Sequence, residues 1–298
     1  MEALGQLPLA LDHAAATCKR TQMSFAAYAT KASSLIAAAP RGASYPRSVA
    51  ATFDLAIDDA VAQCPAADVL MAFLGHCAPE RIPMTLIEGA IDDETERMEA
   101  LAALSEVSLV KHDPFEDGAP AVTVHRLVQA VARARANANA TAQRAVECLI
   151  ARLATTYPDE YNNPASWPRC APLTPHLLAS CETEMADAAT SAQQADLLDR
   201  AGNYFHGRDV YAGARPLFER ALAIREKVLG PEHLDTATSL NNLAMLLKDQ
   251  GDLAGARPLF ERALAVYETA LGHDHSGTAT SLNNLAMLLK EMCIRDRM

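Results

Sequence analysis

The chain contains the same string of thirteen residues twice. TATSLNNLAMLLK occupies Thr236–Lys248 and returns at Thr278–Lys290, an offset of 42 residues. A second string, GARPLFERALA, runs over Gly213–Ala223 and recurs over Gly255–Ala265 at the same offset. A fixed period of this size indicates a repeat array, in which each unit buries its apolar face against its neighbour.

Each repeat predicts two antiparallel helices joined by a tight turn. In the first string, Leu240, Leu243 and Leu247 fall at i, i+3 and i+7, which is one face of a helix. Gly251 then predicts a helix end and Asp252 an N-cap for a second helix. The second helix carries its own apolar stripe, which comprises Ala256, Leu259, Phe260, Ala263, Leu264 and Tyr267.

A weaker unit precedes these two, and its sequence is LLDRAGNYFHGRDVYAGARPLFERAL. We expect its first helix to run from Gln193 to Arg208. The sequence therefore predicts an array of two full units, followed by a lone first helix that ends near Lys290. Pro216 and Pro258 lie near the starts of second helices, and a proline inside a helix costs about 3 kcal/mol, so we expect each to bend its helix without breaking it.

The last eight residues, 291–298, read EMCIRDRM and do not continue the repeat. The turn glycine is missing, so the apolar face of the last helix has only the previous unit to cover it. That face comprises Leu282, Leu285, Ala286 and Leu289. A solenoid needs about three units and a polar cap. We therefore expect this end to be poorly ordered or self-associating, and the chain to be a fragment of a longer protein at both ends.

The packing positions of the repeats resemble the tetratricopeptide pattern of small and large residues. These positions are Leu243, Ala244, Leu247, Ala256, Phe260 and Ala263. The 42-residue period and the strings SLNNLA and LG..H are similar to the longer repeats of kinesin light chains and their bacterial relatives. The resemblance implies a mainly α-helical fold with an α-solenoid over residues 193–290.

A row of mostly polar residues lies a quarter-turn from the apolar stripe of each first helix, at 100° per residue. We call it the polar row; it comprises Asp199, Asn203, His206, Asn241, Met245, Lys248, Asn283, Met287 and Lys290. The family resemblance implies that these helices line the inner groove of a superhelix. Asparagine amides both donate and accept hydrogen bonds, so the row suits an extended peptide. Solvated positions on helices are the alternative interpretation.

Residues 46–136 predict a domain of helices and a hairpin. A helix is expected over Asp93–Ser105, and the segment VSLVKHDPFEDGAPAVTVH then places two β-branched runs around an Asp-Gly turn. RLVQAVARARA predicts another helix. Prolines interrupt the earlier helical pattern at Pro65, Pro79 and Pro83. Helices followed by a two-stranded wing are typical of a winged-helix domain.

Together with the upstream string GQLPLAL, this order resembles the second half of an NB-ARC-type (STAND) signalling NTPase. Pro8 falls on the proline of the G-L-P-L element, and His125 in VHRLVQ falls on the histidine of the M-H-D-like element. The resemblance implies that residues 1–45 are a helical subdomain remnant, that Pro8 lies against adenine and that His125 senses nucleotide phosphates. Residues 137–192 resemble the helical connector of such proteins. Pro8 could instead start a helix, and His125 could simply end a strand.

The chain itself lacks the motifs of a nucleotide-hydrolysing enzyme. No G-x-x-x-x-G-K-[ST] string occurs, so no loop of this type can hold the β- and γ-phosphates. We therefore expect no catalysis and no cofactor for this chain, while ATP or ADP is implied for an intact parent. A nucleotide-binding domain upstream of residue 1 is then an expected partner.

Charge and composition limit the other partners. The formal net charge of −11 and the pI of about 5.3 suit a phosphate backbone poorly, although Arg126, Arg133 and Arg135 make one helix locally basic. Seven cysteines without a C-x-x-C pair, no signal peptide and no long apolar run predict a cytoplasmic protein that does not enter membranes. His273 and His275 could pair as metal ligands, but two ligands make no zinc site.

Three functions remain open from these features. The favoured one is the non-catalytic regulatory and sensor part of an NB-ARC–tetratricopeptide signalling NTPase, whose repeats bind a protein or peptide. The second is a free-standing tetratricopeptide adaptor without nucleotide chemistry. The third is a winged-helix transcription regulator with a repeat sensor.

Overall fold

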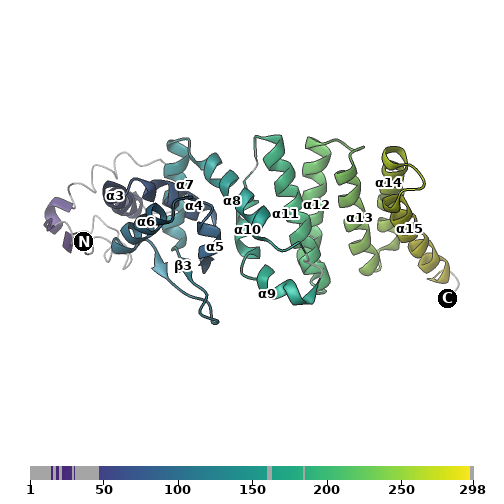
Figure 1. Cartoon of the computed structure of the whole chain (residues 1–298), viewed down its shortest axis with the longest axis horizontal. Helices are drawn as coiled ribbons and strands as arrows, with labels where there is room; N and C mark the ends of the chain where they lie inside the picture. The colour runs from purple at the N-terminus through teal and green to yellow at the C-terminus, as the bar shows by residue number, and fades with distance from the viewer. Residues whose placement is uncertain are drawn as a thin grey trace. The chain divides into compact units, whose positions relative to one another are not determined.

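The computed structural model describes residues 15, 18–19, 22–28, 30, 47–159, 163–183 and 185–295. The chain is mainly helical (Figure 1) and divides into two compact units, Met1–Thr156 and Tyr157–Met298. Pro8, most of the subdomain expected over 1–45, and residues 296–298 lie outside the described residues. No helix in the described part is long and apolar enough to cross a membrane.

The first unit consists of helices around a small antiparallel sheet. Its helices are α3 (Arg47–Gln63), α4 (Ala66–His76), α5 (Met84–Ile87), α6 (Glu94–Glu106), α7 (Arg126–Ala138) and α8 (Ala142–Thr156). Its strands are β1 (Ile82–Pro83), β2 (Lys111–His112) and β3 (Ala121–Thr123), in the order β1-β3-β2. Ile82 lies opposite Val122, and Lys111 lies opposite Thr123. Helix α4 is buried along nearly its whole length.

The expected hairpin is confirmed, with strands β2 and β3 on either side of its turn. Gly118 has a φ of 84°, a left-handed conformation that costs glycine little. The Asp117 carboxylate accepts a hydrogen bond from the amide of Ala119 at 2.9 Å. Strand β1 adds a third strand that the sequence pattern did not predict, since a two-residue strand ending in proline carries no alternation.

The interior of the first unit holds His76 and Cys77, which are both buried. Burial and the charge of Arg133 lower the pKa of His76 to about 4, so the imidazole is neutral at physiological pH. Gln129 donates to the carbonyls of Leu74 (2.8 Å) and Cys77 (2.9 Å), which ties α7 to the end of α4.

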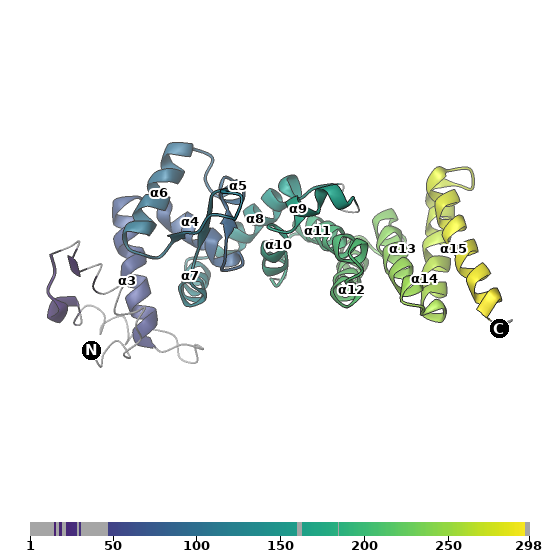
Figure 2. The same ribbon diagram turned by 90° about the horizontal axis from the view of Figure 1, so that it is seen from below.

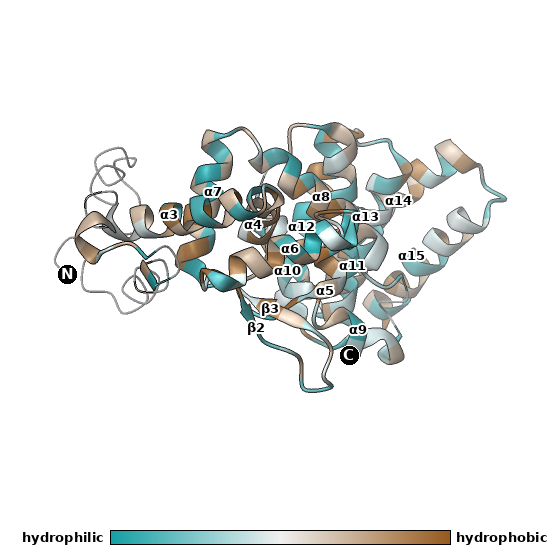
Figure 3. Cartoon of the chain, turned by 60° about the vertical axis from the view of Figure 1, so that its left-hand side comes forward, coloured by the Kyte–Doolittle hydropathy of each residue, from teal (hydrophilic) through white to brown (hydrophobic). Residues whose placement is uncertain are grey.

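The second unit begins with short segments and continues as five long helices. The short segments are η2 (Pro164–Ser166), α9 (Trp167–Cys170) and α10 (Thr174–Ser180). The long helices are α11 (Ala188–Gly207), α12 (Tyr211–Val228), α13 (Leu234–Asp249), α14 (Leu253–Leu271) and α15 (Ser276–Arg295). Consecutive long helices pack side by side (Figure 2), and hydrophobic and hydrophilic residues mix along their ribbons (Figure 3).

The predicted turn between the helices of a repeat is confirmed at Gly251. Its φ is 81°, and its amide donates to the carbonyl of Lys248 while the amide of Asp252 donates to that of Leu247. This pair of bonds is a Schellman motif, which satisfies carbonyls that the helix end leaves free. The Asp252 carboxylate then accepts from the amide of Gly255 at 2.9 Å and caps α14.

Two helix boundaries differ from those expected. Helix α11 begins at Ala188 and not near Gln193, because the Asp187 carboxylate accepts from the amide of Thr190 at 2.8 Å and caps an earlier start. Helix α15 continues to Arg295, beyond the end expected near Lys290, so the first residues of the tail remain helical. Both α12 and α14 run through their internal prolines as continuous helices.

Candidate functional site

The polar row lies on α11, α13 and α15, the first helices of successive repeats. Direct contacts join these helices: His206 Nε2 lies 2.8 Å from Asp249 Oδ2, and Asn284 donates to the Asn241 side chain at 3.3 Å. Both contacts pair one position with the residue 43 further along the chain. The residues of the polar row therefore lie on neighbouring helices, as expected for successive repeats of this length.

Asp199, the first member of the row, is buried and does not lie on an open face. Its carboxylate accepts hydrogen bonds from the guanidinium of Arg225 on α12 and from the hydroxyl of Ser239 on α13 (2.8 Å). Arg225 also donates to the Ser239 hydroxyl at 2.7 Å. The prediction that Asp199 faces a ligand is thus corrected: this side chain joins three consecutive helices.

Burial dominates the electrostatics of this cluster. Loss of solvent raises the pKa of Asp199 to about 6, against the opposing effects of Arg225 and of the Ser239 and Asn242 side chains. The carboxyl group is still largely ionised at neutral pH. A buried pair of this kind is costly to break, because the partner that remains is a charge without solvent.

The other members on α11 and α13 are partly covered. Asn203 donates to the carbonyl of Asp199 at 2.9 Å, within its own helix. Met245 packs against a buried apolar cluster that includes Leu247 and Phe260. Lys248 has a side chain only 10% exposed, and its ammonium lies 3.6 Å from Asp249.

The members on α15 are open to solvent. Asn283, Met287 and Lys290 are all exposed, and the Asn283 amide donates a hydrogen bond to the Met287 sulfur at 3.8 Å. A sulfur acceptor is weak, so the amide remains available to a stronger one. The polar row therefore changes along the repeats, from buried at Asp199 to open at Asn283.

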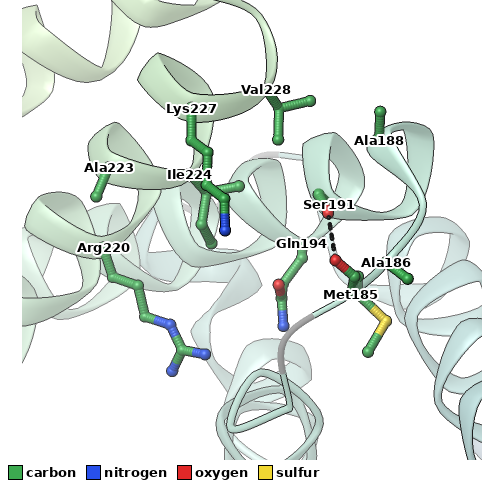
Figure 4. A pocket seen from close by; sticks show the side chains of 10 residues that line it. All are labelled: Met185, Ala186, Ala188, Ser191, Gln194, Arg220, Ala223, Ile224, Lys227 and Val228. Carbon is green, nitrogen blue, oxygen red and sulfur yellow. Dashed lines mark hydrogen bonds between the residues drawn. The ribbon is translucent and has the colours of Figure 1, made fainter.

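A cavity of about 650 Å³ lies elsewhere in the second unit, between the start of α11 and the second half of α12 (Figure 4). Arg220, Ile224 and Lys227 line it from α12, while Ser191 and Gln194 line it from α11. Arg220 donates to the carbonyl of Cys181, and Ser191 donates to the carbonyl of Met185 at 3.4 Å. The repeat pattern did not predict this cavity, because part of its lining, Met185, Ala186 and Ala188, precedes the repeats.

His125, the expected nucleotide sensor, has a structural role in this chain. It follows β3, and its Nδ1 accepts from the amide of Leu127 at 3.2 Å, which caps α7. Partial burial and the charge of Arg126 lower its pKa. The loop histidines of the repeats do the same: His233 caps α13 and His275 accepts from the amide of Gly277 at 3.0 Å.

Two of the three arginines of the basic helix α7 are engaged within the first unit itself. Arg135 contacts Asp58 at 2.6 Å and Asp68 at 2.9 Å, and Arg133 donates to the carbonyl of Gly75 at 2.6 Å. Guanidinium groups that are engaged in this way are poorly placed to release counterions from a nucleic acid.

Sequence comparison identifies the repeats. The tetratricopeptide repeat family model matches residues 193–269 and 240–293. No curated protein sequence matches the chain.

Two solved structures are similar to this chain at low sequence identity. BtubC (BKLC) from P. vanneervenii is 21% identical with a TM-score of 0.40, covering 55% of this chain and 63% of its own. A protein from Podosopora anserina, described as a kinesin light chain with nearly identical TPR-like repeats, is 20% identical with a TM-score of 0.33, covering 55% and 84%. This chain thus spans under two thirds of the length of BtubC. It is a mainly helical protein that carries tetratricopeptide repeats between residues 193 and 293.

Proposed function

We propose that this chain is a protein-interaction module whose repeats bind an extended segment of another protein along the polar row. The observation that carries the proposal is the recurrence of Asn241 as Asn283 on neighbouring first helices. Tetratricopeptide repeats in general mediate contacts between proteins.

The chemistry of the row specifies the kind of segment. The amides of Asn241 and Asn283 can bond backbone N–H and C=O groups, which every extended peptide offers regardless of its sequence. Met287 is 44% exposed and adds an adaptable apolar contact. Lys290 adds a positive charge, which favours an acidic side chain in the partner.

The test uses a random peptide library displayed on phage and selected against the intact chain. For a selected peptide, Asn241→Ala and Asn283→Ala should each weaken binding about fivefold, since a lost hydrogen bond costs about 1 kcal/mol. Thr280→Ala, on the same helix as Asn283 but outside the row, is the matched control. Equal affinity in all three variants, with helicity unchanged, would assign the binding to another surface.

We further propose that the first unit is a winged-helix domain and that the chain is the regulatory and sensor part of a cytoplasmic NB-ARC-type NTPase. The order α4-β1-α5-α6-β2-β3-α7 supports a winged helix, and His125 lies two residues after the last wing strand. An upstream nucleotide-binding domain that holds ATP or ADP would be its partner. Calorimetry tests whether nucleotide binding needs the upstream domain. The isolated chain should not bind ATP tightly, and a micromolar ATP affinity would contradict this proposal.

A second candidate is an adaptor without nucleotide chemistry, and the role of His125 favours it. The Nδ1 atom of this histidine already caps α7, a task that needs no nucleotide. Addition of a nucleotide-binding domain of the NB-ARC type in trans separates the two candidates. Nucleotide-dependent association that His125→Ala abolishes would support the NTPase. A lack of association would leave the adaptor.

A further inference from the structure

The cavity between α11 and α12 has a positively charged lining, although the chain as a whole carries a formal net charge of −11 (Figure 4). Arg220 and Lys227 are its charged side chains, and none of the described residues that line it is acidic. Its volume of about 650 Å³ lies within the range of small-molecule sites. An anion would therefore meet two cations here without a competing carboxylate.

The carboxylates nearest to the cavity in sequence bond to other partners. Asp187, at the start of α11, accepts hydrogen bonds from the amide and the hydroxyl of Thr190 at 2.8 and 3.0 Å. Glu226, which precedes Lys227 on α12, accepts a hydrogen bond from Arg262 of α14 at 2.7 Å. The Lys227 ammonium is therefore left for an anion that enters the cavity.

Side chains of the lining hold the segment that precedes α11 in place. Gln194 is buried and donates to the carbonyl of Cys181 at 3.2 Å, and Arg220 donates to the same carbonyl. Ser191 donates to the carbonyl of Met185 at 3.4 Å. The cavity is thus formed before a ligand arrives, which lowers the cost of binding. Arg220 keeps further N–H groups for that ligand, because one guanidinium carries several donors.

The spacing of the lining residues on α12 specifies the shape of the ligand. Arg220, Ile224 and Lys227 fall at i, i+4 and i+7, which places them on one face of the helix. The first and the last are about 10 Å apart along the helix axis, at 1.5 Å per residue. Figure 4 shows Ile224 beside Lys227, with Arg220 further along α12. The order cation, apolar residue, cation matches an apolar body with an anionic group at each end.

The equivalent positions of the next repeat do not form such a site. Val266, which corresponds to Ile224, is only 5% exposed and packs in an apolar cluster with α13. Thr269 takes the place of Lys227 and carries no charge. The cationic cavity is therefore a property of the first repeat and not of the repeat pattern.

We propose that this cavity binds a small molecule with two carboxylates at opposite ends of an apolar chain. Arg220 binds one carboxylate through its planar N–H groups, and Lys227 binds the other as a point charge. Ile224 and Val228 contact the apolar chain between them. No residue of the polar row lines the cavity, so the inference does not rest on the function proposed above.

The first experiment measures, by titration calorimetry, the binding of octanedioate to the intact chain. An extended octanedioate is long enough to bring its carboxylates to both cations, and its binding should saturate at one site. Octanoate, which lacks one carboxylate, and butanedioate, which is too short to reach both cations, should each bind about tenfold more weakly, because a hydrogen bond to a charged group is lost. Octanediol has the same chain without charge and should not bind.

Charge variants on α12 locate the second carboxylate. Lys227→Thr introduces the residue of the next repeat and should weaken octanedioate binding about tenfold, so that octanedioate and octanoate then bind alike. Arg215→Thr removes the same charge from an exposed position of α12 outside the cavity and should change the affinity less than twofold. Lys227→Thr should not alter the affinity of a peptide selected on the polar row, which separates the two sites.

A steric variant tests the cavity without a change of charge. Ala223 is exposed and lines the cavity, so Ala223→Trp should fill it and abolish octanedioate binding. Ala212→Trp, at an exposed position of α12 outside the cavity, is the matched control and should leave binding unchanged. Circular dichroism verifies that both variants keep their helicity.

Three results would overturn the inference. One is the absence of saturable octanedioate binding to the intact chain. Another is an equal loss in Lys227→Thr and Arg215→Thr, since the charge of the helix alone would then attract the anion. The third is octanoate that binds as tightly as octanedioate, because only one cation would then take part.

Discussion

Helices α13 and α15 share thirteen identical residues, yet they occupy different environments. Helix α13 packs between α12 and α14, and eight of its residues are buried. Helix α15 packs on α14, and only Thr278, Ser281 and Leu288 are buried. Identical residues therefore differ in their contribution to stability, because burial depends on the neighbouring helices and not on the helix sequence.

The two helices should differ most in the stability that is lost when a charged side chain is introduced at equivalent positions. Ala244 is fully buried, whereas its counterpart Ala286 is exposed. Ala244→Glu should lower the free energy of unfolding by more than about 4 kcal/mol, since it places a carboxylate in an apolar cluster without a partner. Ala286→Glu should change it by less than about 0.5 kcal/mol. Urea denaturation followed by circular dichroism measures both, and equal losses would mean that α15 is covered in solution.

The next largest loss tests the buried ion pair of Asp199 and Arg225, which the equivalent positions of the next repeat, Asn241 and Tyr267, do not form. Tyr267 takes the place of Arg225 in the second repeat. Arg225→Met should cost about 3–5 kcal/mol at pH 8, because it leaves the Asp199 carboxylate buried without its cation. Tyr267→Phe removes a hydroxyl that bonds Thr238 at an exposed site and should cost about 1 kcal/mol or less.

This cluster also gives a pH dependence with a definite sign. The folded pKa of Asp199, about 6, lies above its unfolded value of about 4, so the native state binds the proton more tightly. Its contribution to stability is therefore greatest below pH 4 and is lost as the pH rises through 6. The destabilisation by Arg225→Met should be smaller at pH 5 than at pH 8, because a protonated Asp199 needs no cation. A loss that is independent of pH would exclude this account.

A smaller difference in the free energy of unfolding is expected when equivalent leucines of the two helices are replaced by alanine. Leu240→Ala removes a fully buried side chain and should cost about 2–5 kcal/mol. Leu282→Ala removes the same side chain from a site that is 43% exposed and should cost about 1 kcal/mol or less. The ratio of the two losses measures how far the apolar side chains of α15 are covered in solution.

The smallest expected difference between the two helices is in the hydrogen exchange of their backbone amides. Amides of α15 should exchange faster than those of the identical residues in α13, since helix openings are local where burial is low. Hydrogen exchange read by mass spectrometry resolves the two segments despite their shared sequence, because their flanking residues differ. Equal protection in a demonstrated monomer would contradict the comparison.

Much of the repeat fold could be predicted because local signals agree with the packing. The spacing of Leu240, Leu243 and Leu247 gave the buried stripe, and Gly251 and Asp252 gave the turn. The start of α11 could not be found in this way, because the repeat alignment weakens before Gln193 and the cap at Asp187 lies outside it.

The candidate site was less predictable, because it depends on contacts between helices. Asp199 has the same angular position as Asn241, so helix geometry alone places both on one surface. What differs is the second helix, where Arg225 stands opposite Asp199 and Tyr267 takes its place in the next unit. The paired change of Asp199 to Asn241 and Arg225 to Tyr267 was visible in the sequence and could have indicated a buried ion pair.

The close contact between Gly202 and Phe218 limits which residues the first repeat accepts. An added Cβ at position 202 would lie 2.6 Å from the Phe218 ring, so the ring or one of the two helices would have to move. The next repeat has Ala244 at the equivalent position, in one apolar cluster with Phe260 of the recurring string. The first helices of the two repeats are therefore not interchangeable, although their second helices share this string.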